Sequence, residues 1–381
     1  MLKKYTENHL QLYAIKSSQS KGRIFYEKKD PTRTQFQRDR DRIVHCSSFR
    51  RLKHKTQVFV NTTGDHYRTR LTHSMEVSQI SRTIARYLGL NEDLCETLSL
   101  AHDLGHTPFG HAGEDVLNKC MDKYGGFDHN IQTIRILTLL ENKYYKFHGL
   151  NLTIETLDGL IKHNGPPRNL DEFNKILTIN NFKNKISFNN YPSLEAQVAA
   201  ISDDIAYNNH DLEDGLRAGL FDFSKLKNVS FVSNIISKII KNKKKYRREV
   251  LVNEVVRKLI SEMVKDVMKT TIKNIKKIKP TSIKDIYLYN HPIVEFSKKM
   301  KKFDIEIKGF LKKNMYNNKQ VIVNTNSSKI IIKDLFYHLI KNPKKFINKE
   351  LLKNNNKERV VADFIAGMTD RYAINLHKKI K

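Results

Sequence analysis

Apolar residues recur every three or four positions along most of the chain, and this spacing constrains the fold more than any other feature. One such segment begins near Thr72, a suitable helix cap, and stops at Gly89. A second segment ends at Gly105, a third follows Ser193, and residues 230–275 repeat the spacing between lysines. The apolar positions of the first three segments are Met75, Val77, Ile80, Ile84 and Leu88; Leu94, Leu98 and Ala101; and Leu194, Val198, Ile201 and Ile205. The chain is therefore predicted to be all-α.

Two short runs of Val and Ile late in the chain depart from this spacing. Residues 320–323 (QVIV) and 329–332 (KIII) favour short strands, because branched side chains are enriched in strands. The Asn- and Lys-rich residues 313–328 favour a loop. We therefore expect a small irregular or β insertion near residues 320–332.

The chain is strongly basic, with a formal net charge of +29. Such a charge is typical of proteins that meet a polyanion, such as nucleic acid, an acidic membrane or a phosphorylated substrate. Arginine, whose planar fork suits phosphate, is concentrated in the first 100 residues, whereas lysine dominates residues 225–357 beside Asn and Ile. An AT-rich genome would also enrich Lys, Asn and Ile on tolerant surfaces. We therefore place the chemistry in the first 220 residues and keep nucleic-acid binding by the late lysines as an alternative.

The sequence also bears on compartment and membrane association. No run of about 18 apolar residues occurs, which excludes a membrane-spanning helix. The first residues contain no apolar stretch of signal-peptide type, so a cytoplasmic protein is expected. Cys46, Cys95 and Cys120 are far apart, which argues against a disulfide framework or a thiolate zinc site.

Histidine and aspartate residues are concentrated around residue 102. The segment HDLGHTPFGH, residues 102–111, places three histidines and one aspartate within ten residues. A buried Asp103 is costly unless it is paired or bound to a metal, although an isolated His-Asp pair could also cap a helix. His73 on the preceding helix and Asp203 on a later helix favour the metal site. Together with His102, these residues form a nitrogen and oxygen set suited to Mn²⁺, Fe²⁺, Mg²⁺ or Zn²⁺, in the H…HD…D order of HD domains.

Five blocks of sequence, in order, extend this likeness over nearly the whole chain. They are RDRDRI (38–43) with FRRLKHKTQVF (49–59); RTRLTHSMEV (68–77); HDLGHTPFGH (102–111) with Glu114; EAQVAA (195–200) with DDIAYNNHD (203–211); and DFIAGMTDRY (363–372). With these blocks the chain resembles the bacterial deoxyguanosine triphosphate triphosphohydrolase-like family, a branch of the HD superfamily.

The resemblance implies an HD-domain helical core with additional N- and C-terminal helices. Residues 1–65 would form an N-terminal arm and substrate-side helices. Residues 66–220 would form the HD metal-binding catalytic core. Residues 221–381 would form a Lys-rich, helical C-terminal region that packs on the core.

The resemblance also implies a metal-binding set of His73, His102, Asp103 and Asp203. Asp204 competes with Asp203 for the last place. In the family, however, the ligand stands four residues before a substrate-contacting tyrosine, which corresponds to Asp203. Asp204 would then be exposed or lie behind the ligands.

Three further residues match family positions that assist hydrolysis. His111 would act beside the metal, and Glu114 would orient and charge it, a pairing that supports proton transfer near neutral pH. Gly110-His111 could instead only close a turn. His129 would lie near the leaving group, with a purely structural histidine as the alternative.

Five residues match substrate-binding positions of the family. Arg70 and His106 would contact the triphosphate as donors. Tyr207 and Asp211 would contact the sugar, with Asp211 accepting from a 3′-hydroxyl, and Gln57 would lie at the sugar or base edge. Asp203, Tyr207 and Asp211 are spaced by four residues and so share one helix face.

The implied reaction releases a deoxynucleoside and intact inorganic triphosphate from a deoxynucleoside triphosphate, with dGTP or a broader set as substrate. The resemblance also implies a homo-oligomer and a possible single-stranded DNA or dNTP activator, without a membrane partner. Two alternatives remain from the residues alone. One is an HD phosphohydrolase of another nucleotide, either a phosphodiesterase or a nucleotidase. The other is a nucleic-acid-binding module without activity.

Overall fold

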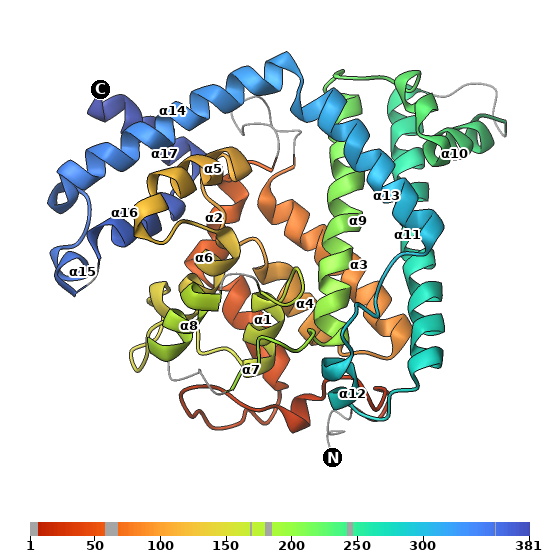
Figure 1. Ribbon diagram of the computed structural model, residues 1–381, viewed down its shortest axis with the longest axis horizontal. Helices are drawn as coiled ribbons and strands as arrows, with labels where there is room; N and C mark the ends of the chain where they lie inside the picture. Colours follow the sequence, from red (N-terminus) through yellow and green to blue (C-terminus); the bar gives the residue numbers. More distant parts are fainter. Residues whose placement is uncertain (1–6, 58–67, 168–169, 180–184, 242–246, 355) are drawn as a thin grey trace.

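The structure, a computed structural model, describes residues 7–381 apart from 58–67, 168–169, 180–184, 242–246 and 355 (Figure 1). Over these residues the chain forms helices and isolated β-bridges but no sheet, which confirms the predicted all-α class. The α-helices are α1 (Gln35–Val44), α2 (Ser47–Arg51), α3 (Arg70–Leu88), α4 (Glu92–Ala101), α5 (Gly110–Cys120), α6 (His129–Arg135), α7 (Ile154–Ile161), α8 (Leu170–Ile179), α9 (Leu194–Arg217), α10 (Ser230–Lys241), α11 (Arg248–Ile278), α12 (Ile283–Leu288), α13 (Lys298–Leu311), α14 (Lys319–Lys341), α15 (Lys349–Asn354), α16 (Lys357–Ala366) and α17 (Asp370–Ile380). None of the helices within these residues combines the length and apolar character needed to cross a membrane.

Helices α3, α4 and α9 form the centre of the fold, and their ends follow local sequence signals. Helix α9 begins after Ser193, as predicted, and the side chain of Ser193 caps it by accepting a hydrogen bond from the backbone of Ala196. Helix α3 ends at Gly89, which adopts a left-handed conformation with φ of 67° and so confirms the predicted stop. The start of α3 differs from the prediction. Thr69 is the N-cap, and Thr72 returns the reciprocal hydrogen bond of a capping box.

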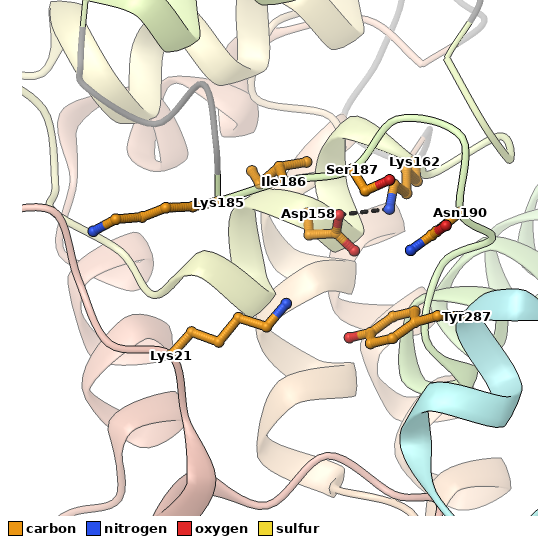
Figure 2. Close-up of a pocket in the computed structure, with 8 residues that line it drawn as sticks. All are labelled: Lys21, Asp158, Lys162, Lys185, Ile186, Ser187, Asn190 and Tyr287. Atoms are coloured by element: carbon orange, nitrogen blue, oxygen red, sulfur yellow. Dashed lines mark ion pairs between the residues drawn. The ribbon is translucent and has the colours of Figure 1, made fainter.

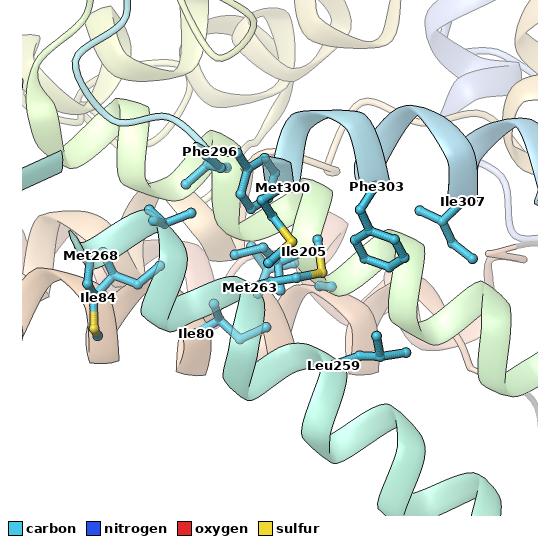
Figure 3. Close-up of a cluster of buried hydrophobic side chains, with 14 of the residues drawn as sticks. Ile80, Ile84, Ile205, Leu259, Met263, Met268, Phe296, Met300, Phe303 and Ile307 are labelled. Atoms are coloured by element: carbon cyan, nitrogen blue, oxygen red, sulfur yellow. The ribbon is translucent and has the colours of Figure 1, made fainter. Parts of the chain in front are cut away.

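A large apolar cluster holds the long C-terminal helices against this centre (Figure 3). Met263 of α11 and Met300 and Phe303 of α13 are buried with Ile205 of α9 and Ile80 of α3. Burial of each such side chain contributes about 1.5–3 kcal/mol. The lysine-rich part of the chain is therefore anchored to the helices that carry the site.

Helix α14 occupies the place of the predicted β insertion. The strands expected at 320–323 and 329–332 and the loop expected at 313–328 were wrong, because residues 312–316 form a π-helical turn and residues 319–341 form one helix. Buried Ile332, Leu335, Phe336 and Leu339 recur at helical spacing and pack in a cluster with α5, α16 and α17. This packing outweighs the weak strand preference of the branched residues.

Candidate active site

Three side chains from different parts of the helical core converge in the candidate site. His73 extends from the first turn of α3, His102 follows the last residue of α4, and Asp203 belongs to α9. Nε2 of His73 lies 2.9 Å from Oδ1 of Asp203, and Nε2 of His102 lies 3.6 Å from the same oxygen. One ligand atom of each residue lies within 4.8 Å of the others, so the three could hold a metal ion.

Asp103 connects this cluster with Arg70. Oδ1 of Asp103 lies 3.5 Å from Nε2 of His102 and 3.1 Å from Nε2 of His106. Its Oδ2 accepts a hydrogen bond of 2.8 Å from Arg70. Burial raises the pKa of Asp103, but Arg70 and the two histidines outweigh it and hold that pKa well below its usual range. Asp103 is therefore ionised beside the three-residue cluster.

The neighbouring aspartates on α9 face different surroundings. Burial raises the pKa of Asp203, but the surrounding histidines, His102 foremost, hold it well below the usual range. Asp204 instead forms an ion pair of 2.8 Å with Lys308 of α13. Of the two, Asp203 faces the histidine cluster.

His102 provides the observation that calls for a cation in this cluster. Its Nδ1 lies 2.7 Å from the backbone oxygen of Ser99. Because a carbonyl oxygen only accepts, Nδ1 carries a hydrogen and donates it to this oxygen. Its Nε2 is buried and has no hydrogen-bond partner among the described residues, although carboxylates of Asp103 and Asp203 surround it. Burial lowers the pKa of His102, but these carboxylates outweigh burial and raise it to about 9. Nε2 therefore needs either a proton or a metal ion, and the residues fit a metal.

His163 joins the cluster, and our sequence interpretation missed it. It follows the end of α7, and its Nε2 lies 3.4 Å from Oδ2 of Asp203. Its ring stacks on that of His102 with centroids 5.2 Å apart. A histidine two residues after the apolar segment 154–161 was the only signal in the sequence, because no motif contains His163.

Next to His73, a chain of polar and charged side chains leads from buried His210 to the partly exposed Glu76 and Arg68. Nδ1 of His73 lies 3.4 Å from Nδ1 of His210, and Nε2 of His210 lies 2.7 Å from Glu76. Glu76 pairs with Arg68 at 3.0 Å, and Arg68 also binds Glu213 at 2.6 Å. Partners of this kind fix the orientation of a metal-binding histidine.

Glu114 of α5 lies between the histidines that were predicted to assist hydrolysis. Its Oε1 lies 2.7 Å from Nδ1 of His129, and its Oε2 lies 3.3 Å from Nδ1 of the exposed His111. The ring of buried His106 stacks on that of His129 with centroids 4.0 Å apart. The structure therefore brings His106, His111, Glu114 and His129 together. Glu114 lies closer to His129 than to His111.

The charges of this second cluster are set by Glu114. Burial raises the pKa of Glu114, but hydrogen bonds from His111 and His129 outweigh it and hold that pKa well below its usual range. Burial lowers the pKa of His129, but Glu114 outweighs it and raises the pKa above its usual value. His106 is different, because burial and then the charges of Arg70 and His129 lower its pKa well below the usual range. Of His106 and His129, His129 is thus the one favoured to carry a proton.

Arg70 and Gln57 lie beside the loop that starts α5. Arg70 is buried, and a Cβ atom placed on Gly110 would lie 2.9 Å from its Nη2. Gly110 has φ of +58°, a left-handed conformation that favours glycine, and the missing side chain leaves room for the guanidinium of Arg70. Gln57 is buried, and within the described residues its Oε1 has no hydrogen-bond partner.

Tyr207 and Asp211 of α9 meet a residue from the lysine-rich region. The hydroxyl of Tyr316 donates a hydrogen bond to Oδ2 of Asp211, and the rings of Tyr207 and Tyr316 lie 6.5 Å apart. Burial raises the pKa of Asp211 to about 7 and holds the pKa of Tyr207 above its usual value. Tyr316 was missed because the sequence places it in an Asn- and Lys-rich stretch without a motif.

Comparisons with known proteins place this site in a family. Residues 70–208 match the HD domain, and residues 294–379 match the phosphohydrolase-associated domain. The chain is 58% identical to the deoxyguanosinetriphosphate triphosphohydrolase-like protein of Pelagibacter ubique, over 95% of this chain and 98% of that protein. The proteins of the same name from Bartonella quintana and Rickettsia prowazekii are 48% and 45% identical, over 97% of this chain and 94% and 97% of their own lengths. The chain belongs to the deoxyguanosinetriphosphate triphosphohydrolase-like family.

Membership of the deoxyguanosinetriphosphate triphosphohydrolase-like family confirms the resemblance inferred from the sequence blocks. The two matched domains support a hydrolase of the phosphohydrolase type. His73, His102, Asp103 and Asp203 all lie within the HD match, whereas Tyr316 lies within the phosphohydrolase-associated match. Both matched segments therefore contribute side chains to this part of the molecule.

Proposed function

We propose that the chain is a metal-dependent deoxynucleoside triphosphate triphosphohydrolase. It would hydrolyse dGTP or a broader set of dNTPs to a deoxynucleoside and inorganic triphosphate. The observation that carries this proposal is the buried His102, whose Nε2 faces two ionised carboxylates beside Arg70. The names of the relatives support a triphosphate ester as substrate.

The metal would be held by His73, His102, Asp103 and Asp203. Their nitrogen and oxygen donors suit Mn²⁺, Mg²⁺ or Fe²⁺, with Zn²⁺ possible. When bound, such an ion polarises a phosphoryl oxygen and neutralises part of the phosphate charge. His73 lies beside Oδ1 of Asp203, and His163 lies beside Oδ2. His163 would therefore help to orient the carboxylate of Asp203.

Arg70 would hold the triphosphate in this site. It is a buried guanidinium with one hydrogen bond to Asp103, and its Nε has no partner among the residues described. A guanidinium fork suits phosphate oxygens, and a buried one loses little entropy when it binds. His106, held by Asp103 through Nε2, would line the neighbouring part of the triphosphate site as a neutral ring.

His129 would supply the proton that the leaving group needs. Water attacks the α-phosphorus, the bond from that phosphorus to the 5′-oxygen breaks, and the 5′-oxygen takes a proton to become the hydroxyl of the deoxynucleoside. His129 is favoured in the protonated form by Glu114, so it suits this general-acid role. His111, exposed on the other side of Glu114, would exchange protons with solvent.

Tyr207 and Asp211 would bind the sugar, and Gln57 the sugar or base edge. Oδ1 of Asp211 is buried without a partner in the described part of the chain, while its Oδ2 is held by Tyr316. That free oxygen can accept a hydrogen bond from a sugar hydroxyl. An oligomeric form and an activating nucleotide or single-stranded DNA stay expectations of the family resemblance.

The test incubates purified protein with Mn²⁺ or Mg²⁺ and a panel of single dNTPs, NTPs and mixtures. Products are separated by chromatography, and the double variant His102→Ala/Asp103→Ala serves as the control. We expect inorganic triphosphate and deoxynucleoside as the primary products, and no activity in the control. Diphosphate or free phosphate as the primary product would support a phosphodiesterase or nucleotidase instead, and activity that survives in the control would reject the metal site.

A further inference from the structure

A polar cavity separate from the candidate active site lies between the N-terminal segment, α7 and α12 (Figure 2). It has a volume of about 170 Å³, and its lining includes Lys21, Asp158, Lys162, Ser187, Asn190 and Tyr287. Lys162 directly precedes His163, but the cavity contains none of the residues of the candidate active site. It therefore needs its own explanation.

Lys162 is a buried ammonium group with few partners among the described residues. Its side chain is 2% exposed and forms an ion pair of 2.6 Å with Asp158. An ammonium group has three N–H donors, and Asp158 is its one ion-pair partner among the described residues. Buried donors require acceptors, so this group calls for further oxygen atoms from within the cavity.

Lys21 and Tyr287 add donors to the same space. The ammonium groups of Lys21 and Lys162 lie 5.6 Å and 5.9 Å from the centre of the Tyr287 ring. In Figure 2 the ends of Lys21, Tyr287 and Asn190 point toward the space in front of Asp158. Lys185 also lines the cavity, but its ammonium group points away from that space.

The groups that line the cavity favour an anion. Lys21 and Lys162 face it with two positive charges, and Asp158 offsets one of them. Burial and the charges of Asp158, Glu195 and Glu155 hold the pKa of Tyr287 well above its usual range, so its hydroxyl remains a donor. Glu155 is occupied by the backbone N–H of Lys21 and by the hydroxyl of Ser20. Among the described lining groups, donors and positive charge therefore exceed the one carboxylate.

We propose that this cavity binds a small phosphate oxyanion, either inorganic phosphate or a short polyphosphate. A phosphate group offers several acceptor oxygens in different directions, which matches donors from Lys21, Lys162, Tyr287 and Asn190. The cavity is smaller than the several hundred Å³ of a typical ligand pocket, so it has room for phosphate or a short polyphosphate and not for a complete nucleotide. The site is independent of the proposed reaction.

The experiment is an isothermal titration of full-length protein that carries Asp203→Ala, which removes a candidate ligand at the active site and leaves the cavity residues intact. The probes are inorganic phosphate, inorganic triphosphate, dAMP and deoxyadenosine. We expect saturable binding of phosphate and triphosphate, and none of deoxyadenosine. Weaker binding of dAMP than of phosphate would support a free oxyanion as the ligand, because the cavity has no room for the nucleoside. Binding of dAMP that is tighter than that of phosphate and is lost in Lys21→Ala, or no saturable binding of phosphate or triphosphate, would overturn the proposal.

Substitutions in the same background locate the site. Lys21→Ala removes an exposed cation and should weaken phosphate binding about tenfold or more, as expected for a lost charge-assisted hydrogen bond. Tyr287→Phe keeps the ring, removes the donor and should weaken binding severalfold. Lys299→Ala removes an exposed charge that does not line the cavity and should leave affinity unchanged. Equal affinities for Lys21→Ala and Lys299→Ala would contradict the assignment.

Discussion

At the scale of single residues, Glu114 has the clearest expected effect on chemistry. Its carboxylate raises the pKa of His129 against the effect of burial. In Glu114→Gln the pKa of His129 should fall, so less of it is protonated near neutral pH, and kcat should drop by about 10²-fold. The alkaline limb of the kcat profile should also move to lower pH. An unchanged pH profile, whatever the loss in rate, would show that Glu114 does not act through His129.

Asp211 should make the folded chain less stable as the pH rises toward neutrality. Burial raises its pKa to about 7, whereas an exposed carboxyl titrates near pH ~4. Between about pH 4 and 7 the folded chain keeps a proton that the unfolded chain has released, so the free energy of unfolding falls as the pH rises. Asp211→Asn removes this titration and should flatten the fall, by up to about 4 kcal/mol over the whole window. Denaturant unfolding at pH 5 and pH 7 measures this, and equal slopes for both proteins would exclude the raised pKa.

The sequence was most informative for residues inside compact motifs. His73, His102, Asp103 and Asp203 could be proposed because two of them are adjacent and the others lie at the expected places on helices. His163 and Tyr316 could not, because each reaches the site from a segment whose own residues show no pattern. His163 depends on how α7 packs beside α9, and Tyr316 depends on a π-helical turn of the lysine-rich region.

At the scale of elements, α14 shows why local preference failed. Residues 329–332 carry three branched side chains in a row, which favours a strand when they are read alone. In the structure Ile332 is fully buried and Ile330 is 54% exposed. Two residues at positions i and i+2 share a face in a strand but lie on different sides of a helix. The buried apolar residues from Ile332 onward recur at helical spacing, and their packing favours the helix over the strand.

This difference gives a direct test of α14. Ile332→Ala should lower the free energy of unfolding by about 2–5 kcal/mol, because it empties a packed site. Ile330→Ala makes the same chemical change at an exposed position and should cost less than about 0.5 kcal/mol. Chemical denaturation compares the two variants. Similar losses for both would favour the strand that the sequence predicted.

The packing of α3 against α9 places His210 behind His73, and this contact should affect metal binding. His210→Ala removes the neighbour of Nδ1 and should weaken Mn²⁺ binding about 10–100-fold. Gln79→Ala, an exposed change on α3, the helix that carries His73, is the control. Calorimetric titration with Mn²⁺ gives both affinities. If His210→Ala binds Mn²⁺ as tightly as Gln79→Ala, the network does not support the ligand.

At the scale of the whole molecule, distant blocks of the sequence are fastened around the site. Lys55 is fully buried, and its ammonium group donates to the backbone oxygen of Ala366 at 2.8 Å. Asp370, the first residue of α17, accepts hydrogen bonds from the backbone of Thr56 at 2.8 Å and of Phe109 at 3.0 Å. The C-terminal block thus holds the segment before Gln57 and the loop before His111.

The all-α class followed from periodicity alone, since helical spacing recurs from α3 to α11. The division into residues 1–65, 66–220 and 221–381 stays a prediction, and the contacts of Lys55 and Asp370 cross its boundaries. Such contacts join residues more than 250 positions apart, and composition carries no signal for them. The net charge of +29 likewise does not indicate which lysines contact an anion. The burial of Lys162, which only the structure shows, makes it a candidate.

The central claim concerns which bond is broken, and hydrolysis in ¹⁸O-labelled water tests it most directly. The protein would be incubated with Mn²⁺ and a dNTP in labelled water, and the products analysed by mass spectrometry. Attack on the α-phosphorus should place one ¹⁸O atom in inorganic triphosphate and none in the deoxynucleoside. Label in diphosphate, in free phosphate or in the deoxynucleoside hydroxyl would contradict it.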